Sequence, residues 1–453
     1  MINTLYLPEL REMLADNNDG EMCEFCTALH PARTAEFMDG LTADEAWRVL
    51  AHADDETRAE IFSFFDHDKQ VEIIESQPRD QIAKLLANLP ADDRVDMLQG
   101  TESDVVTELL PLMPADERRD IQRLLVYPEG TAGAVMTTDY AALGQNLTVR
   151  QALEELNKQE EDLETVNYFF IVDESDHLRG LVSFRRMLSS IVRKPDTKLS
   201  EVMDTDLLTV GVLDDQEEVA RKVAKYDLLA IPVIDQDRRM VGIVTHDDVI
   251  DVVREEAAED AQRSAAVEPL DVSYMRTNVW TLSWKRGVWL AVLFIGSMAT
   301  AFALQQYEAP MKEIGWLMIF IPMLISSGGN CGNQSATLII TAMNHGDVTI
   351  RDWQRVVVRE AAMGMLLGAG LGMIGFVIAL VIRQKIHEAI VIPITLILVI
   401  LASTVIGSIL PLMFKRAGLD PALMSNPFVA GIMDILGIVI YLNVALTLLP
   451  TQG

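Results

Sequence analysis

The sequence predicts a multidomain protein with four parts: an all-α helical solenoid, an α/β pair of repeated units, a connecting helix and an α-helical transmembrane domain of five helices. Three observations predict this organisation. A 12-residue unit repeats near the N-terminus, a longer unit then occurs twice, and five long apolar stretches follow. We expect the four parts at residues 1–130, 131–253, 254–280 and 281–453.

The first part is acidic and repetitive. Each short unit pairs an acidic or polar start with an apolar end, as in ADEAWRVL and RDQIAKLL, and prolines precede several units. Such starts favour helix N-termini. One short helix cannot bury its own apolar stripe, so we expect the helices to stack into a solenoid. The units begin near Pro31, Ala43, Asp55, His67, Arg79, Ala91, Ser103 and Ala115.

Charge is distributed very unevenly along the chain. Residues 1–270 carry a net charge of −32, whereas residues 271–453 carry 9 acidic and 11 basic side chains. An acidic surface repels nucleic acid, so we expect no nucleic-acid partner. Whether the acidic surface only solubilises the protein or binds cations stays open at this point. Cys23 and Cys26 form a C-x-x-C without a second half-site, which favours buried helix residues over a zinc site.

The longer unit occurs twice between residues 133 and 253. The segment YFFIVDESDHLRGLVSF is echoed by AIPVIDQDRRMVGIVTH, so that Gly180 corresponds to Gly242. This pattern resembles a tandem pair of CBS domains. Such domains often hold adenine nucleotides through a threonine and an aspartate near the last helix. The resemblance therefore implies a candidate ATP site at Thr245 and Asp248, although many such pairs bind no nucleotide. Residues 251–268 contain strong helix formers, which predicts a connecting helix.

Five stretches near the C-terminus are long enough to cross a membrane, which requires about 20 apolar residues. Basic residues flank them unequally, and the bias favours a cytoplasmic N-terminus and an outside C-terminus. We expect a multi-pass protein of the plasma membrane, the inner membrane in a bacterium, with lipid as a partner. The third stretch carries a face of glycines suited to close helix packing. The stretches are 287–307, 314–344, 361–382, 389–414 and 421–453.

Asp434 carries the strongest functional signal because it lies deep within an otherwise uncharged stretch. A carboxylate at that depth marks an ion path or a buried partner. In the second stretch, the residues from Ser326 to Gln334 are mostly amides, hydroxyls and glycines, and we expect them to break the helix. Asn426-Pro427 repeats this theme in the last stretch, because a proline frees a carbonyl one turn back.

The donors in these two stretches are hard oxygens, which exclude soft metals far better than they separate the divalent cations from one another. Mg²⁺ exchanges its bound waters reluctantly, so a pore with few ligands, which contact the ion through those waters, suits it. Ca²⁺, Mn²⁺ and Co²⁺ remain alternatives.

The motifs GGNCGNQSATLI and PALMSNPFVAGIMD, together with the acidic repeats and the CBS-like pair, resemble the MgtE family of magnesium channels. The resemblance covers nearly the whole chain. It implies a homodimer with its pore on the twofold axis, and cytoplasmic Mg²⁺ that closes the pore. Two positions depart from the usual pattern, Ser326-Ser327 and Cys331, and neither removes an oxygen from the pore. The implied pore and ion-binding residues are Asp434, Asn426, Ala430, Asn330, Asn333 and Gly329.

The resemblance also implies acidic residues that bind regulatory Mg²⁺. When Mg²⁺ is scarce, facing carboxylates would repel one another and open the pore; when it is plentiful, the lobes would draw together. For any one of these residues the alternative is a solvated surface acid. Glu360 is expected to open the third span, and Asp420 to lie on the cytoplasmic side of the fifth. The others are Asp92, Asp93, Asp96, Asp215, Glu217, Asp227, Asp248, Asp251, Glu256, Glu259 and Asp260.

Three other functions were weighed against this one. A lone deep Asp without a deep Arg or Lys argues against an anion channel. A membrane-anchored sensor without a pore would need neither Asp434 nor the polar second span. No nucleophile–base pair or phosphate loop favours an enzyme. The closest alternative is a CBS-regulated transporter of other divalent cations such as Co²⁺ or Mn²⁺.

Overall fold

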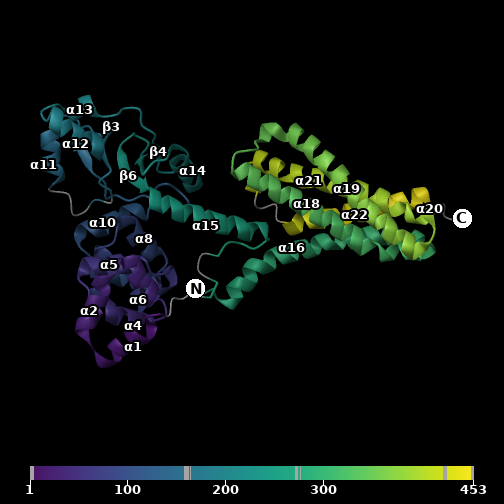
Figure 1. Cartoon of the computed structure of the whole chain (residues 1–453), viewed down its shortest axis with the longest axis horizontal. Helices are drawn as coiled ribbons and strands as arrows, with labels where there is room; N and C mark the ends of the chain where they lie inside the picture. Colours follow the sequence, from purple (N-terminus) through teal and green to yellow (C-terminus); the bar gives the residue numbers. More distant parts are fainter. Residues whose placement is uncertain are drawn as a thin grey trace. The chain divides into compact units, whose positions relative to one another are not determined.

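A computed structural model of the chain describes residues 5–157, 163, 165–270, 274–275, 277–421 and 426–449. It divides into two compact units, Met1–Glu256 and Ala257–Gly453 (Figure 1). Each unit is described by itself below.

The N-terminal unit opens with ten short helices. Each of the eight predicted repeat units begins one of the helices α3 to α10, at the residue that the repeat indicated. The helices are α1 Leu7–Asp16, α2 Asp19–Ala28, α3 Pro31–Met38, α4 Ala43–Leu50, α5 Asp55–Ser63, α6 His67–Ser76, α7 Arg79–Ala87, α8 Ala91–Gln99, α9 Ser103–Leu109 and α10 Ala115–Leu124. Cys26 of α2 is buried as expected, but Cys23 is exposed, so the prediction of two buried cysteines was half wrong.

One position of the repeat ties successive helices together. The guanidinium of Arg58 donates to the carbonyls of Leu50 and Ala53 at the end of the preceding helix. Gln70 and Arg94, which lie 12 and 36 residues further on, do the same for the helices before them. Carbonyls at a helix C-terminus have no partner within the helix, so these side chains satisfy them. This polar position of the repeat therefore stabilises the stacking of successive helices.

Two similar α/β units follow. In each, a short first strand pairs in parallel with the second, which pairs in antiparallel fashion with the third. The pairs Ile171↔Gly180 and Val233↔Gly242 are equivalent, which confirms the predicted duplication. The first unit holds β1 Ala142–Gly144, α11 Val149–Leu156, β2 Tyr168–Val172, β3 Leu178–Ser183 and α12 Phe184–Arg193. The second holds α13 Leu199–Val202, β4 Val210–Gly211, α14 Gln216–Tyr226, β5 Ala230–Ile234, β6 Met240–Thr245 and the start of α15 His246–Ser264.

The connecting helix differs from its predicted extent. We expected a helix over 251–268 and a connecting part at 254–280, whereas α15 starts directly after β6 and ends at Ser264. Ala266 has a φ of 58°, a left-handed conformation that a helix cannot continue through. Pro269 lies shortly beyond. The next helix, α16, begins only at Val279.

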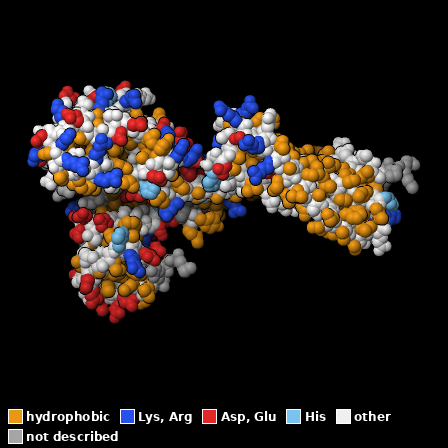
Figure 2. Space-filling view, turned by 45° about the horizontal axis from the view of Figure 1, so that its top comes forward, with side chains coloured by type: hydrophobic (Ala, Val, Ile, Leu, Met, Phe, Trp, Pro, Cys, Tyr) orange, Lys and Arg blue, Asp and Glu red, His pale blue; other side chains and the backbone are white. Residues whose placement is uncertain are grey.

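The C-terminal unit is helical (Figure 1). Among the described residues, four helical stretches are long and apolar enough to cross a membrane: Val279–Gln306, Ile350–Arg383, Ile386–Arg416 and Pro427–Leu448. Figure 2 shows hydrophobic side chains covering the flank of this unit. Its elements are α16 Val279–Gln306, α17 Glu308–Glu313, η3 Gly315–Ile319, α18 Ile321–Asn344, η4 Ile350–Asp352, α19 Trp353–Arg383, α20 Ile386–Ala389, α21 Val391–Arg416 and α22 Asn426–Leu448.

The prediction of a broken second span was wrong. Helix α18 runs without interruption through the glycines and amides, and Pro322 lies in its first turn, where a proline is tolerated. The glycines serve packing instead. A Cβ on Gly328 would lie 2.8 Å from Val399, and one on Gly332 would lie 2.9 Å from Val429. They let α18 approach both α21 and α22 closely. Pro427 likewise lies in the first turn of α22, and the carbonyl it would free lies outside the described residues.

Candidate functional site

Asp434 lies on α22 with a half-buried side chain. Its carboxylate makes no hydrogen bond or ion pair with any residue that the structure describes, and no arginine or lysine follows within α22. Ala430 lies one turn before it and so on the same side of the helix. Asn426 begins α22, and its side chain lies outside the described part of the chain.

Helix α18 brings further oxygen donors to α22. A Cβ on Gly329 would lie 3.5 Å from Cβ of Ala430, so the two helices are in contact at this point. Asn330 is exposed and donates to Ser326 Oγ over 3.4 Å. The amide oxygen of Asn333 is buried and has no hydrogen-bond partner among the described residues. A buried carbonyl oxygen normally has a partner, so this one is available to a ligand or to water.

Glu360 lies on α19, beside rather than within this pair of helices. It directly precedes the apolar stretch 361–382, and α19 begins seven residues before it, at Trp353, after the capping box of Thr349 and Asp352 in η4. The hydroxyl of Ser335 on α18 donates to Glu360 Oε2 over 2.7 Å. Glu360 is thus held against α18 by a hydrogen bond.

A second cluster of carboxylates lies in the N-terminal unit, where α8 faces the start of α15. Burial and the nearby Asp248 raise the pKa of Asp93 to about 6. Burial and Asp93 raise the pKa of Asp96 to about 7, although its side chain is exposed, so water screens part of that effect. Burial raises the pKa of Asp248, which accepts hydrogen bonds from the N–H and the hydroxyl of Thr245.

This cluster joins residues that are over 150 positions apart in the sequence. Asp251, also predicted, contributes repulsion to Asp93. Asp247 and Glu255 belong to the same cluster and were missed, although Asp247 stands directly beside the predicted Asp248. Among the described residues, however, no three His, Cys, Asp or Glu side chains converge closely enough to hold a metal ion as they stand.

Other predicted ligands take part in local contacts. Asp215 caps α14 by accepting from the N–H of Glu217 over 2.9 Å, and Glu217 pairs with Arg221. Asp227 follows α14 with a left-handed φ of 52°. The structure does not bring these three to the cluster at α8. Glu256 accepts from Gln216 over 2.8 Å.

The remaining predicted acids lie in the C-terminal unit. Glu259 and Asp420 both pair with Arg263, and Asp260 accepts from Asn344 over 2.9 Å. Arg263 is a functional candidate that the sequence analysis missed. Only the helical spacing of Glu259 and Arg263 could have indicated it.

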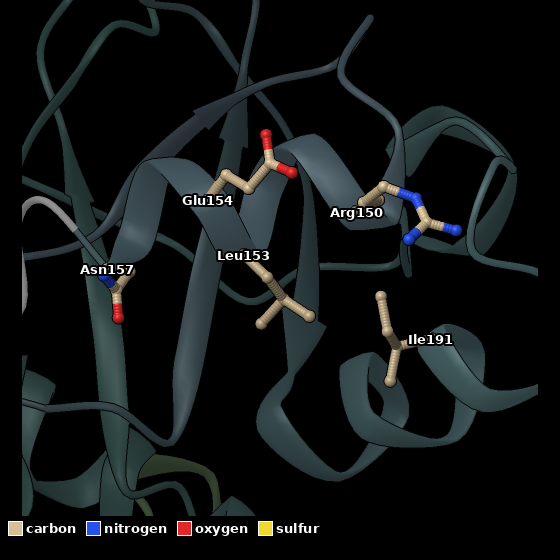
Figure 3. Close-up of a pocket in the computed structure, with 5 residues that line it drawn as sticks. All are labelled: Arg150, Leu153, Glu154, Asn157 and Ile191. Carbon is tan, nitrogen blue, oxygen red and sulfur yellow. The ribbon is translucent and has the colours of Figure 1, made fainter.

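Thr245 and Asp248, the candidate nucleotide site, are neighbours, since both the N–H and the hydroxyl of Thr245 donate to Asp248. Thr245 is buried, and Asp248 also belongs to the carboxylate cluster. A hollow of about 430 Å³ lies elsewhere, on the first α/β unit. Figure 3 shows Arg150, Leu153, Glu154 and Asn157 on one side of it and Ile191 of α12 on the other.

The apolar helices, the deep carboxylate on α22 and the duplicated α/β unit are the features of a multi-pass membrane protein with an acidic N-terminal part. Comparison with known proteins gives the family. Residues 321–444 match the MgtE divalent cation transporter model, residues 29–130 match the MgtE intracellular N domain, and residues 132–193 and 199–255 match the CBS domain. The chain belongs to the MgtE family, whose members are transporters or channels and not enzymes.

Two relatives and two solved structures illustrate the similarity. "Magnesium transporter MgtE" of Thermus thermophilus is 39% identical over 332 residues, which cover 73% of this chain and 72% of that protein. The protein of the same name from Enterococcus faecalis is 34% identical over 326 residues, 72% of this chain and 71% of that protein.

The solved structures resemble the N-terminal part. The soluble part of a magnesium transporter is 33% identical, with a TM-score of 0.51, and the match covers 55% of this chain and 98% of that one. The cytosolic domain of the Mg²⁺ channel MgtE in complex with ATP is also 33% identical with a TM-score of 0.51, over 54% of this chain and 98% of that one.

Proposed function

We propose that the protein is a Mg²⁺-selective channel or transporter for magnesium uptake, closed by cytoplasmic Mg²⁺. The observation that carries the proposal is Asp434, a carboxylate without a described partner on an apolar helix that packs against α18 at Ala430 and Gly329. A charge in such a helix is costly unless an ion or a proton neutralises it. The relatives with this architecture are named magnesium transporters.

The ion path that we propose runs between α18 and α22. Asp434, Ala430 and Asn426 would contribute from α22, and Gly329, Asn330 and Asn333 from α18. Mg²⁺ keeps several of its waters, so one carboxylate with amide and carbonyl oxygens suits a hydrated ion. The same donors would also accept Co²⁺ or Mn²⁺, and transport of those ions is the alternative.

The membrane arrangement that fits this path has five helices, with α18 as the fifth beside the four more apolar ones. The polar side chains of α18 lower its hydropathy, while its glycines pack against α21 and α22. We propose a homodimer in the plasma membrane with a pore on its twofold axis. The basic flanks favour a cytoplasmic N-terminus and an outside C-terminus.

Regulation, in this proposal, uses the carboxylates at α8 and α15 together with the acids of α14 and of the end of α15. The helices of residues 1–130 would form the solenoid, residues 131–253 the CBS pair and residues 254–280 the connection to the membrane part at 281–453. Repulsion among Asp93, Asp96 and Asp248 favours their separation, and carboxylate oxygens are the ligands that Mg²⁺ prefers. Mg²⁺ binding would therefore favour a state in which they approach.

ATP is a second candidate ligand. The proposal rests on the CBS pair, on the adjacency of Thr245 and Asp248, and on the ATP complex of the similar cytosolic domain. Because Asp248 belongs to both proposed sites, ATP and Mg²⁺ would be thermodynamically linked.

Flux measurements on purified protein in liposomes test the proposed function. We expect Mg²⁺ uptake that exceeds uptake of Ca²⁺, Mn²⁺ and Co²⁺ and that falls when Mg²⁺ is present on the side of the N-terminal unit. Equal or greater uptake of Co²⁺ or Mn²⁺ would favour the alternative. An absence of divalent-cation flux from correctly folded protein would refute both.

A further inference from the structure

Arg263 joins the end of α15 to the membrane helices. Residues 257–264 of α15 belong to the C-terminal unit. Within that unit, Arg263 Nη1 donates to Asp420 Oδ2 over 2.6 Å, and its Nη2 pairs with Glu259 on the preceding turn. One arginine therefore holds two carboxylates, of which one is on its own helix and the other is on the segment before α22. The planar guanidinium is suited to this double contact.

A second contact lies on the same face of α15. The side-chain amide of Asn344, the last residue of α18, donates to Asp260 over 2.9 Å. Asp260 and Arg263 are three positions apart, so they lie on one side of the helix. The end of α15 therefore contacts the last residue of α18 and, through Asp420, the segment between α21 and α22.

We propose that Arg263 is a built-in cation that stands in for a divalent ion between Glu259 and Asp420. It latches the end of α15 to the segment between α21 and α22 and competes with Mg²⁺ for this pair of carboxylates. Glu259 and Asp420 are 26% and 32% exposed at their side chains, so their repulsion without a cation is only partly screened.

The pair without arginine is a suitable ligand set, because Mg²⁺ is commonly held by one or two carboxylates while it keeps the rest of its water. The identity of the competing ion rests on the proposed function, whereas the latch itself does not. The two parts therefore need separate measurements on the same protein.

Hydrogen exchange of the full-length protein in detergent tests the latch without relying on transport. In chelator, we expect the amides of residues 257–264 to exchange about three- to tenfold faster in Arg263→Gln than in the parent, because a charge-assisted bond that holds the helix end is lost. Asp420→Asn should have a similar effect, and Arg263→Gln with Asp420→Asn should add little to either. Arg263→Lys should fall between, since a lysine keeps the charge but not the fork.

Titration with Mg²⁺ then tests the competition. In Arg263→Gln, we expect added Mg²⁺ to slow the hydrogen exchange of residues 257–264 again, at a lower concentration than the one at which Mg²⁺ changes exchange in the parent. In Arg263→Gln with Asp420→Asn, added Mg²⁺ should not slow this exchange. Arg119→Gln is the matched control, because Arg119 pairs with Asp116 on α10 in an exposed contact of the same kind. It should leave both curves unchanged.

Unchanged exchange in Arg263→Gln under chelator would overturn the latch. If Arg263→Gln exchanges faster in chelator but added Mg²⁺ slows its exchange no more than that of the double variant, the proposed competition with Mg²⁺ is refuted. A protein that lacks Mg²⁺ flux but shows the predicted exchange in chelator would refute the proposed function and leave the latch intact.

Discussion

Asp434 shows how much a single residue of this sequence reveals. A carboxylate that served only packing would be expected to have a donor nearby, as Glu388 has in Arg383 and Lys385. Asp434 has none among the described residues. Its position was predictable from the sequence alone because a charge inside an apolar stretch is conspicuous. That Asn333 has a buried oxygen without a partner was not predictable, because it depends on how α18 packs.

We predict that Asp434→Ala reduces Mg²⁺ flux into liposomes at least about tenfold, because it removes the negative charge that attracts the hydrated ion into the apolar part of the protein. Asp434→Asn should also fail, since it keeps the size and an oxygen but not the charge. Asp347→Asn, a loss of an exposed carboxylate between α18 and η4, should conduct like the parent. Normal flux through Asp434→Ala would exclude the proposed path.

The raised pKa of Asp93 predicts a dependence of stability on pH. Its pKa is about 6 in the folded protein and about 3.9 in an unfolded chain, so the folded state binds the proton more tightly. Folding stability should therefore be greatest below pH 4 to 5 in this respect and fall as pH rises through 6, by the linkage of proton binding to folding.

In chelator, we expect the first thermal transition of the full-length protein to fall by roughly 2–4 °C between pH 5 and pH 7.5. Asp93→Asn should flatten this dependence, and added Mg²⁺ should oppose it. A pH profile that is the same in the parent and in Asp93→Asn would show that Asp93 does not titrate against its neighbours.

At the scale of helices, periodicity predicted far more than composition did. Eight helix starts followed from the 12-residue repeat because each unit carries its own N-terminal signals, such as the capping box of Thr42 and Glu45. The break expected in α18 was wrong because glycine in a membrane helix can either interrupt the helix or let a second helix pack closely, and sequence alone does not distinguish the two. The close approach of Gly332 to Ser403 and Val429 shows that here it serves packing.

The glycine face of α19 gives a test of this packing argument. A Cβ on Gly368 would lie 2.8 Å from Cα of Ile397 on α21, whereas one on Gly370 would meet nothing within 4 Å. We expect Gly368→Ala to destabilise the C-terminal unit by about 1–3 kcal/mol, because backbone cannot move aside as a side chain does. Gly370→Ala should be nearly neutral. Thermal unfolding in detergent distinguishes them, and equal stability of the two variants would contradict close packing of α19 on α21.

At the scale of the whole molecule, the two units differ in how their acidic residues are placed. Acidic residues of the N-terminal unit repel one another across α8 and α15, whereas the C-terminal unit isolates one carboxylate on α22. The sequence indicated Asp434 as a charge inside an apolar stretch, and the family resemblance implied that acids of residues 1–270 bind Mg²⁺. It could not predict which acids of 1–256 meet, because Asp93 and Asp248 come together only through the docking of the helical repeats on the second α/β unit.

The last prediction concerns gating, and it depends on which of two opposed effects is larger. Replacing the clustered acids by asparagine removes repulsion that favours separation, and it also removes ligands that Mg²⁺ would use to hold the closed state. Repulsion between partly solvated acids is weak, under about 1 kcal/mol per pair. A bound ion, in contrast, stabilises the state that binds it by an amount that grows with concentration above its dissociation constant. Ligand loss should therefore dominate at high Mg²⁺.

We predict that Asp93→Asn, Asp96→Asn, Asp248→Asn and Asp251→Asn combined keep the channel conducting at cytoplasmic Mg²⁺ concentrations that silence the parent. Excised-patch recording with stepped Mg²⁺ on the cytoplasmic face measures this directly. The matched control replaces four exposed acids that lie outside the cluster, Asp55, Asp104, Asp116 and Asp206, with asparagine. It removes the same formal charge and should close as the parent does. If both quadruple variants close at the parent's Mg²⁺ concentration, the acidic surface only solubilises the protein. If both stay open, total charge rather than this cluster sets the response.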